Sequence, residues 1–167
     1  MGRHSLVSAR ITVQPENHDK TVAFLQTLKN DDTYPYIRTE MFSIGTKEVP
    51  HQYFTSIIAF AASYKNIEDH FTDFVIKFEH VLRNIGFDTC KLHLETEYFN
   101  DYNFMWVNKK TNHMKNDDVV KNQLIETDTF YFGYGNRTRY GTLRDTLNDT
   151  DCFDKCDFGF SYPINKE

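Results

Sequence analysis

The chain has 167 residues, a formal net charge of -5 and 16% aromatic residues. This length predicts one domain that buries a core without disulfides or metals, and the negative charge argues against general electrostatic binding of nucleic acid. No apolar run reaches the length of a membrane span, and the first residues lack the apolar run of a signal peptide. The three cysteines are typical of a reducing compartment, so we expect a cytoplasmic protein without membrane segments.

The first part of the chain predicts three strands and one helix. Apolar residues alternate over Ser5–Val13, which is typical of a strand with one buried face. A helix is expected from Asn17 to about Lys29, followed by a second strand over Tyr36–Ile44. Gln52–Ala62 is apolar on both faces, which favours a central position in the sheet.

The clearest periodic pattern in the sequence lies between Asn66 and Gly86 and predicts an amphipathic helix. Asn66 is expected to cap its first turn, and Gly86 to end it in the left-handed conformation. Its apolar residues recur at steps of three and four: Ile67, Phe71, Phe74, Val75, Phe78, Val81, Leu82 and Ile85. The solvent side is expected to carry two ion pairs between residues four apart, Asp73–Lys77 and Glu79–Arg83.

A fourth strand is expected over Asp88–Phe99, with a hairpin turn at Asn100–Asp101 leading into Tyr102–Val107. The element order is then strand, helix, strand, strand, helix, strand, which is the split βαβ pattern. We therefore predict an α+β fold: a ferredoxin-like two-layer sandwich with an antiparallel sheet, formed by residues 1–110. Right-handed crossovers place both helices on one face of this sheet and leave the other face open.

Residues 111–167 form an aromatic and acidic C-terminal extension, which we expect to pack on the core within the same domain. Thr129–Thr142 reads as a hairpin around Gly135. The extension also contains Cys152 and Cys156, but no second Cys/His pair of zinc-site spacing accompanies them, so no metal site is predicted.

Side-chain alternation places several charged residues on the open face of the predicted sheet: Arg10, Arg38, His93, Glu95 and Glu97. Such a set is able to hold a polar ligand, with His93 and Glu95 as weak candidates for acid/base catalysis. The favoured interpretation is a solvated face of cross-strand ion pairs. A straight strand spreads His93, Glu95 and Glu97 too far apart to converge on one metal ion.

The extension supplies a second candidate surface. Its basic and aromatic residues are Tyr131, Tyr134, Arg137, Arg139 and Tyr140, and its candidate docking acids are Asp149, Asp151 and Asp154. The rings and arginines are suited to stacking single-stranded bases, although cation–π packing within a hairpin explains them equally well.

No nucleophile elbow, phosphate-binding loop, dinucleotide fingerprint or zinc-protease helix occurs in the sequence. We therefore expect a non-catalytic binding protein, without a cofactor, that docks on a protein or nucleoprotein partner and inhibits or regulates it. Two alternatives remain open: a small-molecule-binding domain or enzyme that uses the open face, and a single-stranded nucleic-acid-binding protein. Pairing of two copies through the open face is a further possibility, because exposed aromatic surface is unusual in a monomer.

Overall fold

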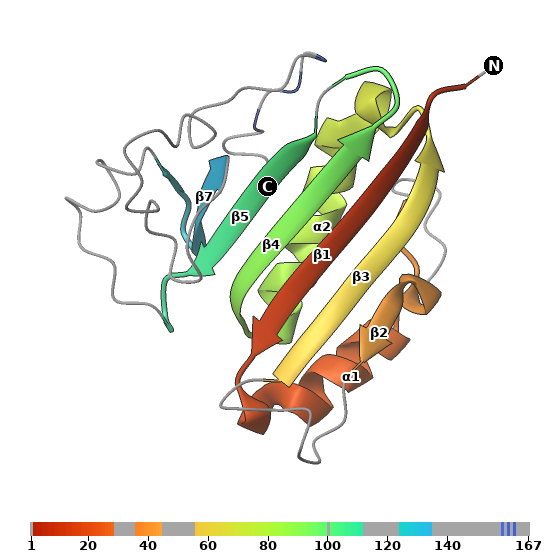
Figure 1. The fold of residues 1–167 in the computed structure, drawn as a ribbon. Helices are drawn as coiled ribbons and strands as arrows, with labels where there is room; N and C mark the ends of the chain where they lie inside the picture. The colour runs from red at the N-terminus through yellow and green to blue at the C-terminus, as the bar shows by residue number, and fades with distance from the viewer. Residues whose placement is uncertain are drawn as a thin grey trace.

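The computed structural model describes residues 2–28, 36–44, 56–99, 101–111 and 124–134, together with residues 158, 160 and 162. These residues form a mixed α+β fold, in which two α-helices cover one face of an open seven-stranded antiparallel sheet (Figure 1). The strands are β1 (His4–Val13), β2 (Phe42–Ile44), β3 (Ser56–Lys65), β4 (Phe87–Thr96), β5 (Tyr102–Asn108), β6 (Ile125–Glu126) and β7 (Phe130–Tyr134), and the helices are α1 (His18–Gln26) and α2 (Phe71–Ile85). The strand order is β2-β3-β1-β4-β5-β7-β6.

The interior position predicted for the third strand is confirmed, because β3 pairs with β1 on one side and with β2 on the other. The hairpin between β4 and β5 is also confirmed. The strand predicted over Tyr36–Ile44 is wrong for most of its length. Thr39–Met41 forms a 3-10 turn, and the Thr39 hydroxyl donates a hydrogen bond to the Leu25 carbonyl near the end of α1 at 2.8 Å. Helix ends leave such carbonyls unpaired, which explains why the chain turns here before it enters β2.

The apolar stripe of α2 is buried as predicted, and its phenylalanines form a continuous aromatic layer against the sheet. The rings of Phe74 and Phe78 stack with centroids 5.8 Å apart, and the Phe78 ring meets Phe60 of β3 at 5.7 Å. Burial of each such side chain stabilises the fold by about 1.5–3 kcal/mol. Gly86 ends the helix with φ of 60°, as its position predicted.

The beginning of the predicted helix differs from expectation. Ile67–His70 forms a separate 3-10 turn before α2, and the side chain of Asn66 caps neither element. Asn66 instead adopts the left-handed conformation, and its Oδ1 accepts a hydrogen bond from the Arg3 backbone N–H at 2.7 Å. The Asn66 N–H donates in return to the Arg3 carbonyl, so this residue joins the start of β1 to the start of α2.

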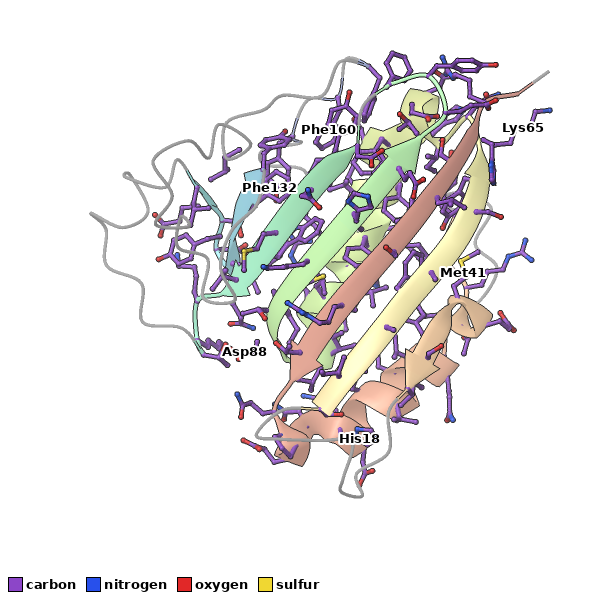
Figure 2. All side chains as sticks on the ribbon, in the orientation of Figure 1. His18, Met41, Lys65, Asp88, Phe132 and Phe160 are labelled. Carbon is purple, nitrogen blue, oxygen red and sulfur yellow. The ribbon has the colours of Figure 1, made fainter. Side chains whose placement is uncertain are left out.

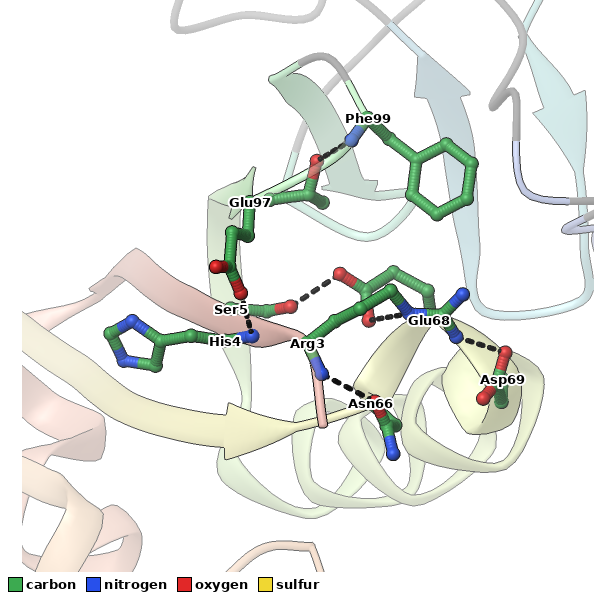
Figure 3. A network of polar contacts seen from close by, with 9 residues as sticks. Arg3, His4, Ser5, Asn66, Glu68, Asp69, Glu97 and Phe99 are labelled. Carbon is green, nitrogen blue, oxygen red and sulfur yellow. Dashed lines mark hydrogen bonds and ion pairs between the residues drawn. The ribbon is translucent and has the colours of Figure 1, made fainter. Parts of the chain in front are cut away.

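A buried carboxylate completes this junction (Figure 3). Glu68 accepts a hydrogen bond from the Ser5 hydroxyl of β1, and its Oε2 lies 4.0 Å from the Arg3 Nε atom. The Arg3 guanidinium also forms an ion pair with Asp69 and lies over the Phe99 ring, 5.6 Å from the centroid. Because a buried charge is costly without partners, these contacts fix where α2 begins relative to the sheet.

The prediction that Lys77 and Glu79 face solvent is wrong, because both residues are buried. Glu79 Oε2 accepts hydrogen bonds from the Trp106 Nε1–H at 2.9 Å and from the Tyr162 hydroxyl. The Tyr162 ring stacks on Phe132 of β7 with centroids 4.0 Å apart. Trp106 and Tyr162 therefore cover a side of α2 that helical periodicity alone assigns to solvent.

The other described aromatic residues near the C-terminus lie in the same layer. Phe160, labelled in Figure 2, packs edge-to-face against Phe71 of α2 and Phe104 of β5, and Phe158 also meets Phe71. Phe71 and Phe104 belong to the core on the helix side of the sheet. These rings therefore extend the helix layer, whereas the division of the chain into a core and an extension remains a prediction.

A matched pair of isoleucines on β3 tests the assignment of the two faces. Ile58 is fully buried under the helices, whereas its neighbour Ile57 is 43% exposed on the opposite face. We expect Ile58→Ala to lower the free energy of unfolding by about 2–5 kcal/mol, because it leaves a cavity in the core. Ile57→Ala should cost less than about 1 kcal/mol. Urea titration of both variants in dilute solution measures the difference, and equal losses would contradict the assignment.

Candidate functional site

The face of the sheet opposite α1 and α2 presents three long strands, β3, β1 and β4, side by side toward the viewer in Figure 1. Antiparallel register aligns their outward side chains in rows across the strands. One row contains Ser63, Leu6 and Glu95, the next contains Ala61, Ser8 and His93, and the third contains Ala59, Arg10 and Lys91. We call these three rows, with Ile57 beyond the third, the open face.

The open face is accessible to solvent. Leu6 is 41% exposed and Ile57 is 43% exposed, which is unusual for large aliphatic side chains in the middle of a sheet. Between them lie the small exposed residues Ser8, Ala59 and Ala61. Short side chains in the centre permit the backbone of another molecule to approach closely, and the flanking aliphatic groups supply apolar contact area.

Charge is divided along the strands of the open face. Arg10 and Lys91 occupy the third row, whereas Glu95 occupies the first row. Within the described part of the chain, neither Arg10 nor Glu95 forms an ion pair. Within these three rows, the third carries the cations Arg10 and Lys91, the first carries the anion Glu95, and the row between them carries His93.

His93 is held by the neighbouring strand. Its Nδ1–H donates to Asn103 Oδ1 at 2.9 Å, and its Nε2 atom lies 3.7 Å from an Asp101 carboxylate oxygen. Glu95 lies in the next row, two residues along β4, where its cross-strand neighbour on β1 is Leu6. The two candidate acid/base residues thus have different cross-strand neighbours, and Arg10 lies diagonal to His93, one row away on the side opposite to Glu95.

Beyond β4 the same side of the sheet is closed. Met105 and Val107 of β5 pair with Lys91 and Thr89, which places all four side chains on one side, yet Met105 and Val107 are each only 1% exposed. Tyr131 of β7 is buried beside them, with the Lys109 ammonium 5.5 Å from its ring centroid. The accessible surface therefore ends near β4.

Among the residues that the structure describes, the other predicted site residues lie outside the three rows of the open face. Arg38 precedes the 3-10 turn and lies in no strand, which corrects its predicted place on the sheet. Glu97 follows β4, and its Oε2 accepts a hydrogen bond from the His4 N–H at 2.8 Å. Tyr134 lies in the aromatic layer, 5.6 Å from the Phe104 ring. Six predicted residues lie outside the described part of the chain: Arg137, Arg139, Tyr140, Asp149, Asp151 and Asp154.

Leu6 and Ile57 were not among the site residues predicted from the sequence. A signal for Ile57 existed, because the third strand is apolar on both faces whereas helices cover only one face. Leu6 shares the alternation parity of Ser8 and Arg10, so it also belonged to the uncovered side.

The described residues include no group of three potential metal-ligating side chains. Cys90 is buried, which raises the pKa of its thiol, whereas Cys152 and Cys156 lie outside the described residues. No described helix is long and apolar enough to cross a membrane. Comparison of the chain with protein-family models, curated proteins and solved structures found no match.

Among the described carboxylates, Glu79 has the pKa that departs most clearly from its ordinary value. It is only 3% exposed, and burial raises its pKa, although the hydrogen bonds from Tyr162 and Trp106 and the charge of Arg83 oppose that rise. The folded chain therefore keeps this proton to a higher pH than the unfolded chain does. The contribution of Glu79 to stability falls as the pH rises from its ordinary value of 4.5 to the raised value.

We expect Glu79→Gln to remove this decline, because the amide does not titrate while its oxygen still accepts hydrogen bonds. Urea unfolding at a series of pH values above 4 should show wild-type stability falling relative to that of the variant. Tyr162→Phe removes a donor to the carboxylate, so the decline should extend to higher pH. If the stabilities of the wild type and Glu79→Gln change in parallel with pH, Glu79 ionises alike in the folded and unfolded chains, which would contradict the prediction.

Proposed function

We propose that the chain is a non-catalytic binding protein that docks on a protein or nucleoprotein partner through the open face and thereby inhibits or regulates it. The observation that carries this proposal is the exposure of Leu6 and Ile57 around a centre of small residues, on a face that the helices leave uncovered. Exposed aliphatic groups at the centre of a sheet, bordered by charges, have the anatomy of a protein interface.

The contacts of the acid and base candidates favour this function over catalysis. The described hydrogen bond of His93 goes to Asn103 of the adjacent strand, and Glu95 lies in the row next to that of His93. The buried carboxylate of Glu68, just before α2, accepts a hydrogen bond from Ser5 of β1, and that of Glu79 in α2 accepts hydrogen bonds from Trp106 of β5 and from Tyr162. These buried carboxylates stabilise the fold. We therefore assign binding to the open face, which is accessible to solvent.

We further infer that the first six elements constitute a ferredoxin-like core, to which β5, β7 and β6 are added at one edge. Support comes from the order β1-α1-β2-β3-α2-β4 along the chain and from the arrangement β2-β3-β1-β4 within the sheet. This fold hosts many unrelated functions, so the proposal rests on the surface and not on the fold. A cytoplasmic location likewise remains a prediction from the sequence.

Site-specific photo-cross-linking tests the proposed surface. A benzophenone amino acid placed at Ala61 occupies the centre of the open face, and the matched control places it at Ala23, an exposed alanine of α1. In host cells we expect discrete protein adducts from position 61 and few from position 23. Adding Ile57→Arg to the position-61 probe should weaken the adducts, because a charge replaces apolar contact area.

Equal adduct patterns from positions 61 and 23 would count against the open face as the docking surface. The unfolding transitions of both probe variants should match that of the wild type, since each replaces an exposed side chain.

A further inference from the structure

The open face has a charge pattern that complements itself. Taking the row of Ala61, Ser8 and His93 as the centre, Arg10 and Lys91 lie one row to one side, and Glu95 lies one row to the other. Neighbouring positions on one side of a strand are about 6.6 Å apart, so the opposite charges stand about 13 Å apart along the strands. A surface with this division matches a copy of itself turned end for end.

We propose that the protein bound by the open face is a second copy of this chain, stacked face to face about a two-fold axis along the central row. This inference rests on the proposed function, because it takes the open face as a binding surface and specifies the partner.

The two-fold rotation reverses the strand direction but keeps each strand above its own counterpart. Lys91 then lies over Glu95 of the second copy, and Arg10 lies one strand away from that same carboxylate. Each ion pair occurs twice in the dimer, as an isologous interface requires. The complementary charges fix the orientation, since stacking the copies in the same direction would place like charges together.

The uncharged residues fit the same arrangement. Leu6 lies over Arg10 of the second copy, whose aliphatic stem gives it an apolar contact. Ser8, Ala61 and His93 each meet their own counterparts at the axis, and the short side chains of Ser8 and Ala61 allow the two sheets to approach to about 10 Å there. The exposure of Leu6 in the single chain is thereby explained.

The size of the open face sets the expected strength of the dimer. The three rows with Ile57 extend over seven residues, about 23 Å along the strands, and three neighbouring strands span about 15 Å, giving roughly 350 Å² per copy. Stable interfaces bury about 800 Å² per partner. We therefore expect a reversible dimer with a dissociation constant in the micromolar range, which weakens as salt is added.

Charge reversal with mixing tests the proposed pairing. Arg10→Glu/Lys91→Glu makes both ends of the open face negative, and Glu95→Lys makes both ends positive. In sedimentation equilibrium between about 5 and 500 µM, the wild type should dimerise. Each variant alone should dimerise at least tenfold more weakly, because like charges meet twice. An equimolar mixture of the two variants should recover the dimer, since every facing pair is then opposite in charge.

Recovery on mixing also shows that both variants are folded. A charge control, Lys20→Glu on the exposed surface of α1, should dimerise like the wild type. Variants that dimerise as tightly as the wild type would overturn the pairing, and so would a mixture that remains monomeric. A wild type that stays monomeric overturns it too. In that case the Ala61 cross-linker separates the two ideas: an adduct to another protein preserves the proposed function, and the absence of any adduct removes both.

Discussion

The structure depends on burying the phenylalanine stripe of α2 against the sheet. Phe71, Phe74 and Phe78 are each no more than 1% exposed, and their rings connect β3, β5 and the described C-terminal aromatics in one layer. Because aromatic side chains contribute large buried areas and prefer defined ring geometries, this layer fixes the position of α2 as well as its stability. The polar junction of Arg3, Asn66 and Glu68 then sets where the helix begins.

That one-sided core leaves the two faces of the sheet with different roles. The helix side takes the aromatic residues of α2 together with Phe158, Phe160 and Tyr162, so the described C-terminal rings add to the core and do not cover the open face. The opposite side is closed over β5 and β7 but accessible over β3, β1 and β4. A partly apolar surface that also carries charges of both signs is suited to binding another sheet or protein surface, which is the function we propose.

Local patterns predicted much of this fold. The period of α2, the glycine that ends it, the alternation of β1 and β4 and the β4–β5 hairpin are all confirmed. The failures were places where distant contacts override local preference. Tyr162 and Trp106 hydrogen-bond to Glu79 and bury it. The side chain of Asn66 accepts a hydrogen bond from the Arg3 backbone, and Thr39 donates one to a carbonyl at the end of α1. The exposure of Leu6 and Ile57 was not predicted either, although the alternation that placed Arg10 on the open face applied equally to Leu6.

The central claim is that one face of the sheet is core and the other is a binding surface. The solvent accessibility of methyl groups on the two faces tests this claim most directly. A soluble paramagnetic agent should strongly relax the methyl signals of Leu6 and Ile57 in a dilute methyl-labelled sample, while Val7 and Ile58 remain protected. In a concentrated sample the signals of Leu6 and Ile57 should become protected as well. Protection of Leu6 and Ile57 already in dilute solution would mean that the chain covers its own open face, and it would contradict the account.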